Sequence, residues 1–393
     1  MEDLLLVVNA GSSSLKFQVY RLAASTQPVV VYGGQISGIG GRAPTFRVKD
    51  AAGTVRIDEP LSRGVAADLH SAQHTLVHWI RSELDRVPIA VGHRIVHGGA
   101  HFKESVIIDA GVLRALEALI PLAPLHQLNN LSPVHAIQEL WPDVRQVACF
   151  DTVFHQGHDP VVSHFALPRS LYDRGVRRYG FHGLSYEYIA ETLRRDVPDV
   201  ARGKVIVAHL GSGASACAML DGRSVDSTMG FTALDGLPMG TRPGRLDAGV
   251  LLWMMEQGYD HDGIQHLLYN ESGLKGLSGL SADTRDLLAS DSPVARLAID
   301  YFIYRSAESL AGLCVALGGL DALVFTAGIG ENSPAIRAGI CERLGWLGIK
   351  IDAAGNAGHE RRISSPDSAI AVYVVPTNEE SIIARHTLAA IGR

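Results

Sequence analysis

Two similar segments, separated by half of the 393-residue chain, constrain the fold more than any other feature of this sequence. Residues 5–14 read LLVVNAGSSS and residues 206–215 read IVAHLGSGAS. Each is an apolar run that ends in a Gly/Ser turn, followed by an alternating stretch (15–20 and 216–220) that suits the returning strand of a hairpin. The pattern predicts a duplicated domain with one Gly/Ser hairpin in each half; chance similarity of two such turns is the alternative.

Short β-branched runs alternate with longer helical patterns along the chain. Strands that alternate with helices indicate an α/β protein. Ser-Pro pairs at 132–133 and 333–334 predict helix starts, with helices to about Leu140 and Leu344 and Gly345 as the C-terminal cap of the second. The expected buried strands are 4–8, 89–96, 145–150, 204–210, 322–326 and 369–375.

Composition excludes several classes of partner. The net charge of −6 creates no field that would attract nucleic acid or an anionic membrane.

The first apolar run is too short for a signal peptide, and no run is long enough to span a bilayer. We therefore expect a cytoplasmic protein with reduced thiols, because its cysteines are scattered without a CxxC pair. The cysteines are Cys149, Cys217, Cys314 and Cys341.

Three glycine-rich segments are suited to bind phosphate. The tips of the two predicted hairpins offer backbone N–H groups and hydroxyls. The segment 327–333, AGIGENS, is expected to be a loop between a strand and the helix that starts at Pro334, and helix N-termini bind nucleotides; it could equally be an ordinary turn. The chain contains no GxxxxGK[ST] motif, which disfavours a P-loop NTPase. The hairpin-tip residues are Asn9, Ser12, Ser14 and Lys16 in the first copy and Gly211, Ser212 and Gly213 in the second.

Charged residues occur within apolar or glycine-rich segments, where an unpaired charge is costly. Arg94 lies in VGHRIVHGG (91–99), Arg242 in PMGTRPG (238–244) and His182 in YGFHG, while Asp151 ends an apolar strand. A single arginine of this kind would usually form a structural ion pair. Two arginines, an aspartate and a histidine near phosphate-type loops favour phosphoryl transfer, because guanidinium groups bind phosphate bidentately.

Eight motifs occur in order along the chain: NAGSSSLKF (9–17), GHRIVHGG (92–99), APLH (123–126), FDTVFH (150–155), YGFHG (179–183), GLPMGTR (236–242), GIGEN (328–332) and PTNEE (376–380). With them the sequence resembles the acetate, propionate and butyrate kinase family over essentially its whole length. The resemblance implies two ribonuclease-H-like domains of the actin/sugar-kinase superfamily with an interdomain cleft. It implies a domain of residues 1–151 plus 381–393, and a C-terminal domain of 152–380 that binds nucleotide and forms a homodimer.

The same resemblance implies reversible, direct in-line phosphoryl transfer from ATP to acetate, giving ADP and acetyl phosphate, with Mg²⁺ (or Mn²⁺). The catalytic residues carried over are Arg94, His126, Asp151, His182 and Arg242. The acyl substrate is assigned to Arg94, Val96, Leu125, Phe181 and Ala233, and the metal to Asn9 and Glu379. The nucleotide is assigned to Asn9, Ser12, Ser14, Lys16, His209, Leu210, Gly211, Ser212, Gly213, Asp283, Thr284, Arg285, Gly328, Ile329, Gly330, Glu331 and Asn332.

This assignment agrees with the chemistry. A carboxylate is already ionised at pH 7 and needs no general base. The enzyme must instead align two anions and neutralise the charge on the transferred group. Asp151 is therefore expected to orient the metal, its waters or Arg94, although an aspartyl-phosphate intermediate is a chemical alternative.

Helix capping separates the two glutamates of PTNEE. With Thr377 as the N-cap, Glu380 would occupy the third helical position and complete a capping box. Glu379 would then be left to bind the metal.

The sequence departs from the family pattern at several positions. Ser212 replaces the usual Asn and is expected to lose one phosphate contact, Ala233 replaces the usual Pro of the acyl pocket, and Arg245 adds positive charge beside Arg242. After His126, Gln127-Leu128 stands where Asn-Pro is common. These changes leave open the nucleotide preference and whether acetate or propionate is preferred.

Two other classes of function are alternatives to phosphoryl transfer. His93, His97 and His101 have a metal-ligand spacing, but on a strand they would extend over about 13 Å, which is too far for one ion of a metal hydrolase. An actin-like nucleotide-dependent binding protein would use the phosphate loops but would leave Arg94 and Arg242 without a role.

Overall fold

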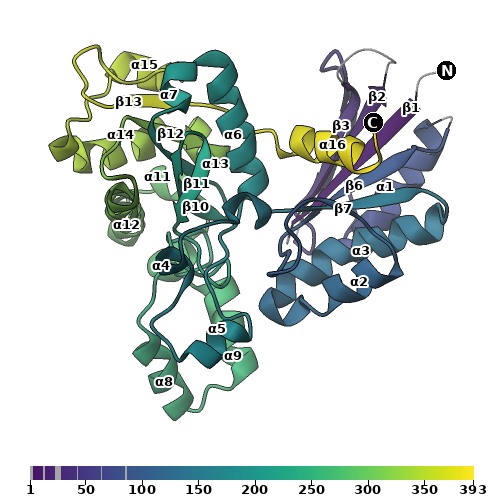
Figure 1. Cartoon of the computed structure of the whole chain (residues 1–393), viewed down its shortest axis with the longest axis horizontal. Coiled ribbons are helices and arrows are strands. Elements are labelled where there is room, and N and C mark those ends of the chain that lie inside the picture. The colour runs from purple at the N-terminus through teal and green to yellow at the C-terminus, as the bar shows by residue number, and fades with distance from the viewer. Residues whose placement is uncertain (1–2, 12–13, 23–27, 42, 63, 85) are drawn as a thin grey trace. The chain divides into compact units, whose positions relative to one another are not determined.

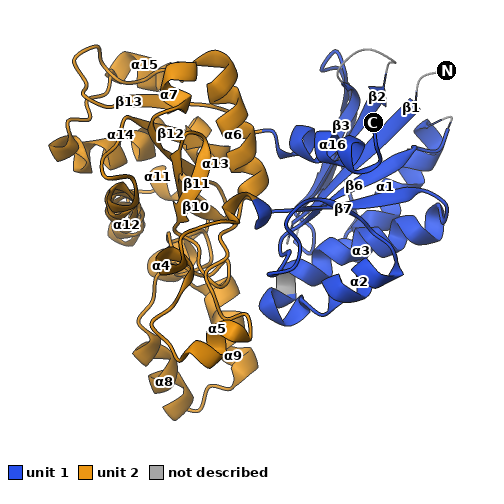
Figure 2. Ribbon diagram, viewed as in Figure 1, with its two compact units in different colours: residues 1–153, 378–393 blue, residues 154–377 orange. Residues whose placement is uncertain are grey.

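The computed structural model describes the chain apart from residues 1–2, 12–13, 23–27, 42, 63 and 85. The chain divides into two compact units (Figure 2). Unit 1 contains residues 1–153 and 378–393, and unit 2 contains residues 154–377. The domain boundaries expected from the sequence, after 151 and after 380, lie two and three residues from these positions.

Unit 1 is built on an eight-stranded sheet with the strand order β5-β4-β3-β2-β1-β6-β8-β7 (Figure 1). Strand β1 is buried along its length, because Leu4, Leu6 and Val8 pack in a core with α1 while α16 packs on β1, β6 and β8. The strands are β1 (Asp3–Ala10), β2 (Ser14–Leu22), β3 (Val29–Ser37), β4 (Thr45–Asp50), β5 (Val55–Pro60), β6 (Ala90–Ile95), β7 (Val106–Ile107) and β8 (Arg145–Phe150). The helices are α1 (Leu69–Glu83), α2 (Ala110–Glu117), α3 (Pro124–Leu140) and α16 (Glu379–Ala390).

Unit 2 is built on a five-stranded sheet with the order β11-β10-β9-β12-β13. The strands are β9 (Lys204–Leu210), β10 (Ala214–Leu220), β11 (Arg223–Ser227), β12 (Ala322–Thr326) and β13 (Ala371–Val374). The longer helices are α6 (Gly183–Asp196), α8 (Ala248–Glu256), α12 (Pro293–Leu317) and α14 (Pro334–Arg343). The short helices are α4 (Pro160–Ser163), α5 (Arg169–Asp173), α7 (Pro198–Ala201), α9 (His261–His266), α10 (Gly273–Ser278), α11 (Thr284–Leu288), α13 (Ala327–Asn332) and α15 (Ala353–Ala357).

The two sheets share one topology. The series β3-β2-β1-β6-β8 in unit 1 corresponds to β11-β10-β9-β12-β13 in unit 2, with antiparallel pairs first and parallel pairs last. The two similar sequence segments form the equivalent hairpins β1–β2 and β9–β10. The duplicated α/β fold predicted from the repeat is confirmed.

One predicted helix start and one predicted C-terminal cap were wrong. Helix α3 begins at Pro124 and continues through Pro133, so Pro124 is the proline in the first helical turn. Helix α14 does begin at Pro334, but the Ser333 side chain forms no capping hydrogen bond, and the helix ends at Arg343, before Gly345. A local rule identifies prolines that fit a helix start but does not choose between two of them.

All four cysteines are free thiols. No helix in the described part of the chain has both the length and the apolar character to cross a bilayer.

Candidate functional site

In unit 1, Arg94 and Asp151 meet near the carboxyl ends of the parallel strands β6 and β8. Arg94 lies on β6, within a strand rather than a turn, and Asp151 directly follows the parallel strand β8. The Arg94 Nη2 donates to Asp151 Oδ2 at 2.6 Å, and its Nε donates to Oδ1 at 3.0 Å. The Asp151 backbone N–H donates to the Ile95 carbonyl, which fixes the carboxylate beside the arginine.

Asn9, at the end of β1, links this pair to the start of α16. Its Nδ2 donates to Glu379 Oε2 at 3.1 Å and to Glu380 Oε1 at 2.9 Å, while its Oδ1 accepts from Arg94 Nη1 at 3.2 Å. Arg94 Nη1 lies 3.8 Å from Glu379 Oε2. We call these five residues the Arg94 cluster: Asn9, Arg94, Asp151, Glu379 and Glu380.

The capping assignment made from PTNEE was wrong by one residue. Asn378 is the N-cap of α16, and its side chain accepts from the backbone N–H of Ser381. Glu379 and Glu380 therefore occupy the first two helical positions. Glu380 is not a capping-box partner, and both carboxylates contact Asn9.

The Arg94 cluster combines one cation with three carboxylates. Burial alone would lower the pKa of Arg94, but Asp151, Glu379 and Glu380 more than reverse this effect, so the pKa is raised and the guanidinium remains charged. Asp151 is 1% exposed. The cluster therefore carries net negative charge, which favours the binding of a cation nearby.

The second turn of α3 is clamped to the ends of two strands. Asn130 Oδ1 accepts from the Val96 N–H at 2.7 Å, and its Nδ2 donates to the Ala10 carbonyl at 2.7 Å. His126 lies one turn earlier, so it shares a helix face with Asn130. Asn130 was missed by the sequence analysis, since a helical Asn carries no signal of its own.

Several other residues of unit 1 were predicted to bind substrate or nucleotide. Lys16, on β2, is the register partner of Asn9 and lines a shallow groove together with Glu380. Ser14 begins β2, and Val96 is buried. Ser12 lies outside the described residues, as does the side chain of Leu125.

In unit 2, His182 is the centre of a second group. It precedes α6 with a left-handed backbone (φ 58°), and its Nδ1 lies 2.8 Å from Ser215 Oγ. The Tyr186 hydroxyl also bonds Ser215 Oγ, at 2.5 Å. The His182 ring stacks on His209, with centroids 4.1 Å apart. We call these residues, with Arg242, the His182 cluster: His182, Tyr186, His209, Ser215 and Arg242.

Gly213, at the tip of the β9–β10 hairpin, shows that His182 and Arg242 converge. A Cβ at this position would lie 2.9 Å from Arg242 Nη2 and 3.3 Å from His182 Nε2. Arg242 Nη1 also donates to the Ala233 carbonyl at 2.8 Å. The structure thus brings the predicted catalytic residues His182 and Arg242 to Gly213, a residue predicted to bind the nucleotide. It also places Ala233, predicted to line the acyl pocket, in contact with Arg242.

The GIGEN segment is a short helix, α13, rather than the expected loop. Glu331 Oε1 accepts from the N–H groups of Ala327 (2.8 Å) and Thr377 (3.1 Å), and Asn332 Nδ2 donates to the Gly328 carbonyl. The fully buried Arg337 donates to the carbonyls of Gly330 and Glu331 at 2.9 Å. Strand β12 therefore leads directly into this helix, and the Glu331 and Asn332 side chains hold its backbone.

The start of α11 carries the third nucleotide segment. Asp283 is its N-cap and pairs with Arg285, with Nη2 2.5 Å from Oδ2, while Thr284 is buried. Leu210 is buried at the end of β9, Gly211 is partly buried and Ser212 is exposed at the hairpin tip. Ile329 lies within α13.

The sequence matches the model of the Acetokinase family over residues 4–385. The chain belongs to this family. It is 52% identical to the acetate kinase of Nitrobacter hamburgensis over 390 residues, covering 99% of this chain and 96% of that relative.

Two solved structures agree with this family assignment. The propionate kinase of Francisella tularensis superimposes with a TM-score of 0.88 at 35% identity, covering 98% of this chain and 99% of the other. The acetate kinase of Porphyromonas gingivalis gives 0.83 at 35% identity, covering 99% and 100%. The expected fold, with two ribonuclease-H-like halves of the actin/sugar-kinase superfamily, is confirmed.

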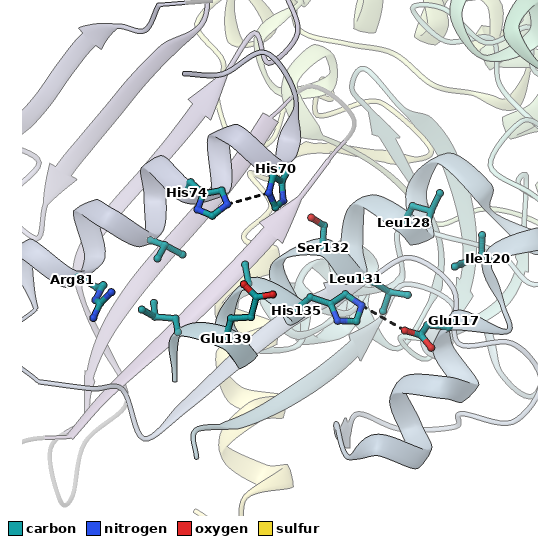
Figure 3. A pocket seen from close by; sticks show the side chains of 13 residues that line it. His70, His74, Arg81, Glu117, Ile120, Leu128, Leu131, Ser132, His135 and Glu139 are labelled. Atoms are coloured by element: carbon teal, nitrogen blue, oxygen red, sulfur yellow. Dashed lines mark hydrogen bonds and ion pairs between the residues drawn. The ribbon is translucent and has the colours of Figure 1, made fainter. Parts of the chain in front are cut away.

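A groove of about 650 Å³ lies between α1 and α3 (Figure 3). His70, His74 and His135 line it, with His70 Nε2 3.1 Å from His74 Nε2 and His135 paired with Glu117. Of the residues assigned to substrate, nucleotide or metal, none whose side chain the structure describes lines this groove.

The metal-hydrolase alternative is wrong. The chain belongs to the Acetokinase family, and His93 and His97 are buried, with His93 Nε2 already paired with Gln146 Oε1 at 2.7 Å. Among the described residues no three His, Cys, Asp or Glu side chains are arranged to hold a metal ion.

Proposed function

We propose that this member of the Acetokinase family transfers the γ-phosphoryl group of ATP to acetate, reversibly, giving acetyl phosphate and ADP. The observation that carries the proposal is the convergence of His182 and Arg242 on Gly213 at a Gly/Ser hairpin tip. Such a tip offers backbone N–H groups to phosphate oxygens, and a guanidinium beside it can neutralise charge on the transferred group.

Arg94 is the group we assign to the acyl carboxylate. Its Nε and Nη2 already donate to Asp151, so the ion pair fixes the plane of the guanidinium. Nη1 is directed toward Asn9 and Glu379, and we propose that acetate binds on this side. Asp151 then acts as a positioning residue for Arg94 and takes no proton, because acetate is already an anion.

Arg242 and His182 are assigned to the transferred phosphoryl group. Arg242 is held by the Ala233 carbonyl, and His182 by Ser215 and the ring of His209. Groups fixed before the reaction stabilise developing charge without the cost of reorganisation. We propose that both bind the phosphoryl oxygens more strongly as charge builds on them in the transition state.

The donors of the Arg94 cluster fit a magnesium ion. Mg²⁺ prefers oxygen ligands and is usually held by one or two carboxylates, with phosphates and waters filling the other positions. Glu379 and Glu380 supply carboxylate oxygens beside the Asn9 amide, in a cluster with excess negative charge. When bound, Mg²⁺ (or Mn²⁺) would neutralise phosphate charge. The assignment of Asn9 and Glu379 to the metal is thereby extended to Glu380.

We propose that transfer is direct. Both carboxylate oxygens of Asp151 accept from Arg94, which makes this group a poor nucleophile toward phosphorus. ATP that is chiral at the γ-phosphorus should give acetyl phosphate with net inversion. Retention, with label trapped on Asp151, would establish the covalent route instead.

The function is tested by a coupled assay for acetyl phosphate with purified protein, ATP, Mg²⁺ and acetate. We expect acetyl phosphate in stoichiometric amounts with ADP. Binding of ATP without transfer to any carboxylate would favour an actin-like binding protein. A higher kcat/KM with propionate would instead favour the second candidate, a propionate or other short-chain acyl kinase, which the Ala233 substitution and the similarity to a propionate kinase support.

We also propose a homodimer formed through unit 2. Three large apolar side chains of α8, Leu252, Trp253 and Met255, are each more than half exposed. A contiguous exposed apolar helix usually marks a protein–protein contact. Light scattering should give twice the 42.1 kDa chain mass, and Trp253→Asp should give monomers. A cytoplasmic location agrees with the use of ATP and with the free thiols.

A further inference from the structure

His155, the last residue of the FDTVFH motif, has no part in the chemistry assigned above. The His155 side chain is buried (3% exposed), and both of its ring nitrogens form hydrogen bonds. Nε2 lies 2.9 Å from the Phe181 carbonyl, and Nδ1 lies 2.8 Å from Ser224 Oγ. Because a carbonyl can only accept, Nε2 carries the proton, and Nδ1 accepts from the Ser224 hydroxyl.

Ser224 extends this pair into a directed chain of hydrogen bonds. His158 Nε2 lies 2.7 Å from Ser224 Oγ, and since the hydroxyl proton is given to His155, His158 must be the donor here. The Cys217 thiol also donates to this oxygen, at 3.3 Å. The Ser224 oxygen is thus saturated, and the chain runs from His158 through Ser224 and His155 to the Phe181 carbonyl.

Both histidines remain uncharged in this chain. Burial lowers the pKa of His155 to about 3, with His158 adding to the effect. Burial and then the charge of Arg178 lower the pKa of His158 to about 4. At neutral pH each ring therefore has one N–H and one acceptor nitrogen, which is what the chain of donors requires.

The acceptor at the end of this chain directly precedes His182. Gly180 packs against the His155 ring with φ +76°, and a Cβ there would lie 2.5 Å from His155 Cγ. Phe181 is held by its carbonyl, and His182 follows in a left-handed conformation that is strained for a residue other than glycine. Such a conformation persists only where neighbouring contacts impose it.

A second contact leads from His155 to the same imidazole. Its ring meets Tyr186 edge-on, with centroids 5.6 Å apart. The Tyr186 hydroxyl and His182 Nδ1 share Ser215 Oγ. The backbone of His182 and its side chain are therefore both fixed by groups that contact His155.

We propose that His155 is a positioning residue for His182: its Nε2–H holds the Phe181 carbonyl and thereby sets the left-handed turn that directs the His182 imidazole toward Gly213. Ser224 and His158 contribute by holding the proton on Nε2 of His155. This inference rests on the proposed function only in giving His182 a role in phosphoryl transfer. The fixed turn itself does not depend on it.

Three substitutions test the proposal. His155→Phe keeps the ring and loses both hydrogen bonds. His155→Gln carries an amide N–H at the same number of bonds from Cβ as Nε2, and can still donate to Phe181. His155→Asn reaches only as far as Nδ1, so it can accept from Ser224 but not donate to Phe181. His261→Phe, a surface histidine of the same unit, is the matched control.

We expect His155→Phe and His155→Asn to lower kcat by about 10²-fold, the scale of a 1 Å displacement of a catalytic group, with KM for acetate and ATP changed less than about threefold. His155→Gln should recover most of the loss, and the control should match wild type. If His155→Phe does not fold, the comparison of Gln with Asn still decides. Equal losses in Gln and Asn, or losses that follow the melting temperature alone, would overturn the proposal.

A spectroscopic readout separates this proposal from the proposed function. In ¹⁵N-histidine-labelled protein, the His182 ring signals should shift in His155→Phe and His155→Asn and stay near wild type in His155→Gln. This result is expected even if the wild-type protein makes no acetyl phosphate, in which case the reaction assignment fails and the positioning role stands. Unchanged His182 signals in all three variants would contradict the positioning role.

Discussion

The Arg94 cluster and the His182 cluster use charge in opposite ways. In the Arg94 cluster, one guanidinium is balanced by three carboxylates, and its shortest contact is the 2.6 Å bond to the buried Asp151. The His182 cluster is built of imidazoles, hydroxyls and backbone groups around a single guanidinium, whose Nη1 donates to a backbone carbonyl.

We infer that the two arginines have different tasks: Arg94 orients the acyl carboxylate, and Arg242 stabilises charge on the transferred phosphoryl group. A charge that is compensated within the protein orients neighbouring groups, and removing it leaves its buried partner unpaired at a large cost in stability. Arg242 Nη1 donates to a neutral group, the Ala233 carbonyl, and we infer that the charge of this guanidinium is directed to a phosphoryl group. Removing Arg94 should therefore cost stability as well as function, whereas removing Arg242 should cost function alone.

The largest effect is expected for Arg242→Ala. A guanidinium that stabilises a transferring phosphoryl group contributes about 10³–10⁵ in rate, so kcat should fall by at least about 10³-fold while KM for acetate changes little. Steady-state kinetics measure this directly. Arg202→Ala, which removes a surface arginine of the same unit paired with Asp199, should leave both constants unchanged. A kcat near wild type for Arg242→Ala would remove Arg242 from the reaction.

An intermediate effect is expected for Glu379→Gln and Glu380→Gln. Each keeps an oxygen for the Asn9 amide but removes one negative charge from the proposed metal site. Both variants should need more Mg²⁺ for half-maximal activity, by about tenfold, with Glu379→Gln the more severe because Glu379 also faces Arg94. A wild-type Mg²⁺ dependence in Glu380→Gln would contradict a metal-binding role for Glu380.

The smallest effect is expected at Ala233, which contacts the His182 cluster through its carbonyl. The absence of the usual proline ring removes pocket wall, and one methylene in an apolar pocket is worth about 1–3 kcal/mol. Propionate should therefore be used within roughly tenfold of acetate, and Ala233→Pro should increase the preference for acetate. The measurement is the ratio of the two kcat/KM values. An unchanged ratio would mean that Leu234 or another neighbour already fills the space.

Local patterns determined the parts of the fold that depend on few residues. The two Gly/Ser hairpins and the strands around them followed from β-branched runs and tight turns, whose geometry is set within about ten residues. The starts of α3 and α16 did not follow. Pro124 and Pro133, like Thr377 and Asn378, are both acceptable at a helix start, and packing with the rest of the unit decides between them.

The site divides in the same way. Arg94, Asp151, His182 and Arg242 stood out because charge in an apolar segment requires a partner or a ligand. The groups that hold them, such as Asn130, Ser215 and Tyr186, are neutral and common, so only their tertiary contacts reveal a role.

The central claim, that the two arginines have different tasks, is tested most directly by measuring kcat and the melting temperature together for Arg94→Ala and Arg242→Ala. Arg94→Ala leaves the buried Asp151 without its cation, which typically costs about 3–5 kcal/mol, so the melting temperature should fall by roughly 5–15 °C along with activity. Arg242→Ala should melt within about 3 °C of wild type while losing more of its kcat. Equal melting temperatures for the two variants, or a larger decrease for Arg242→Ala, would contradict the division of roles.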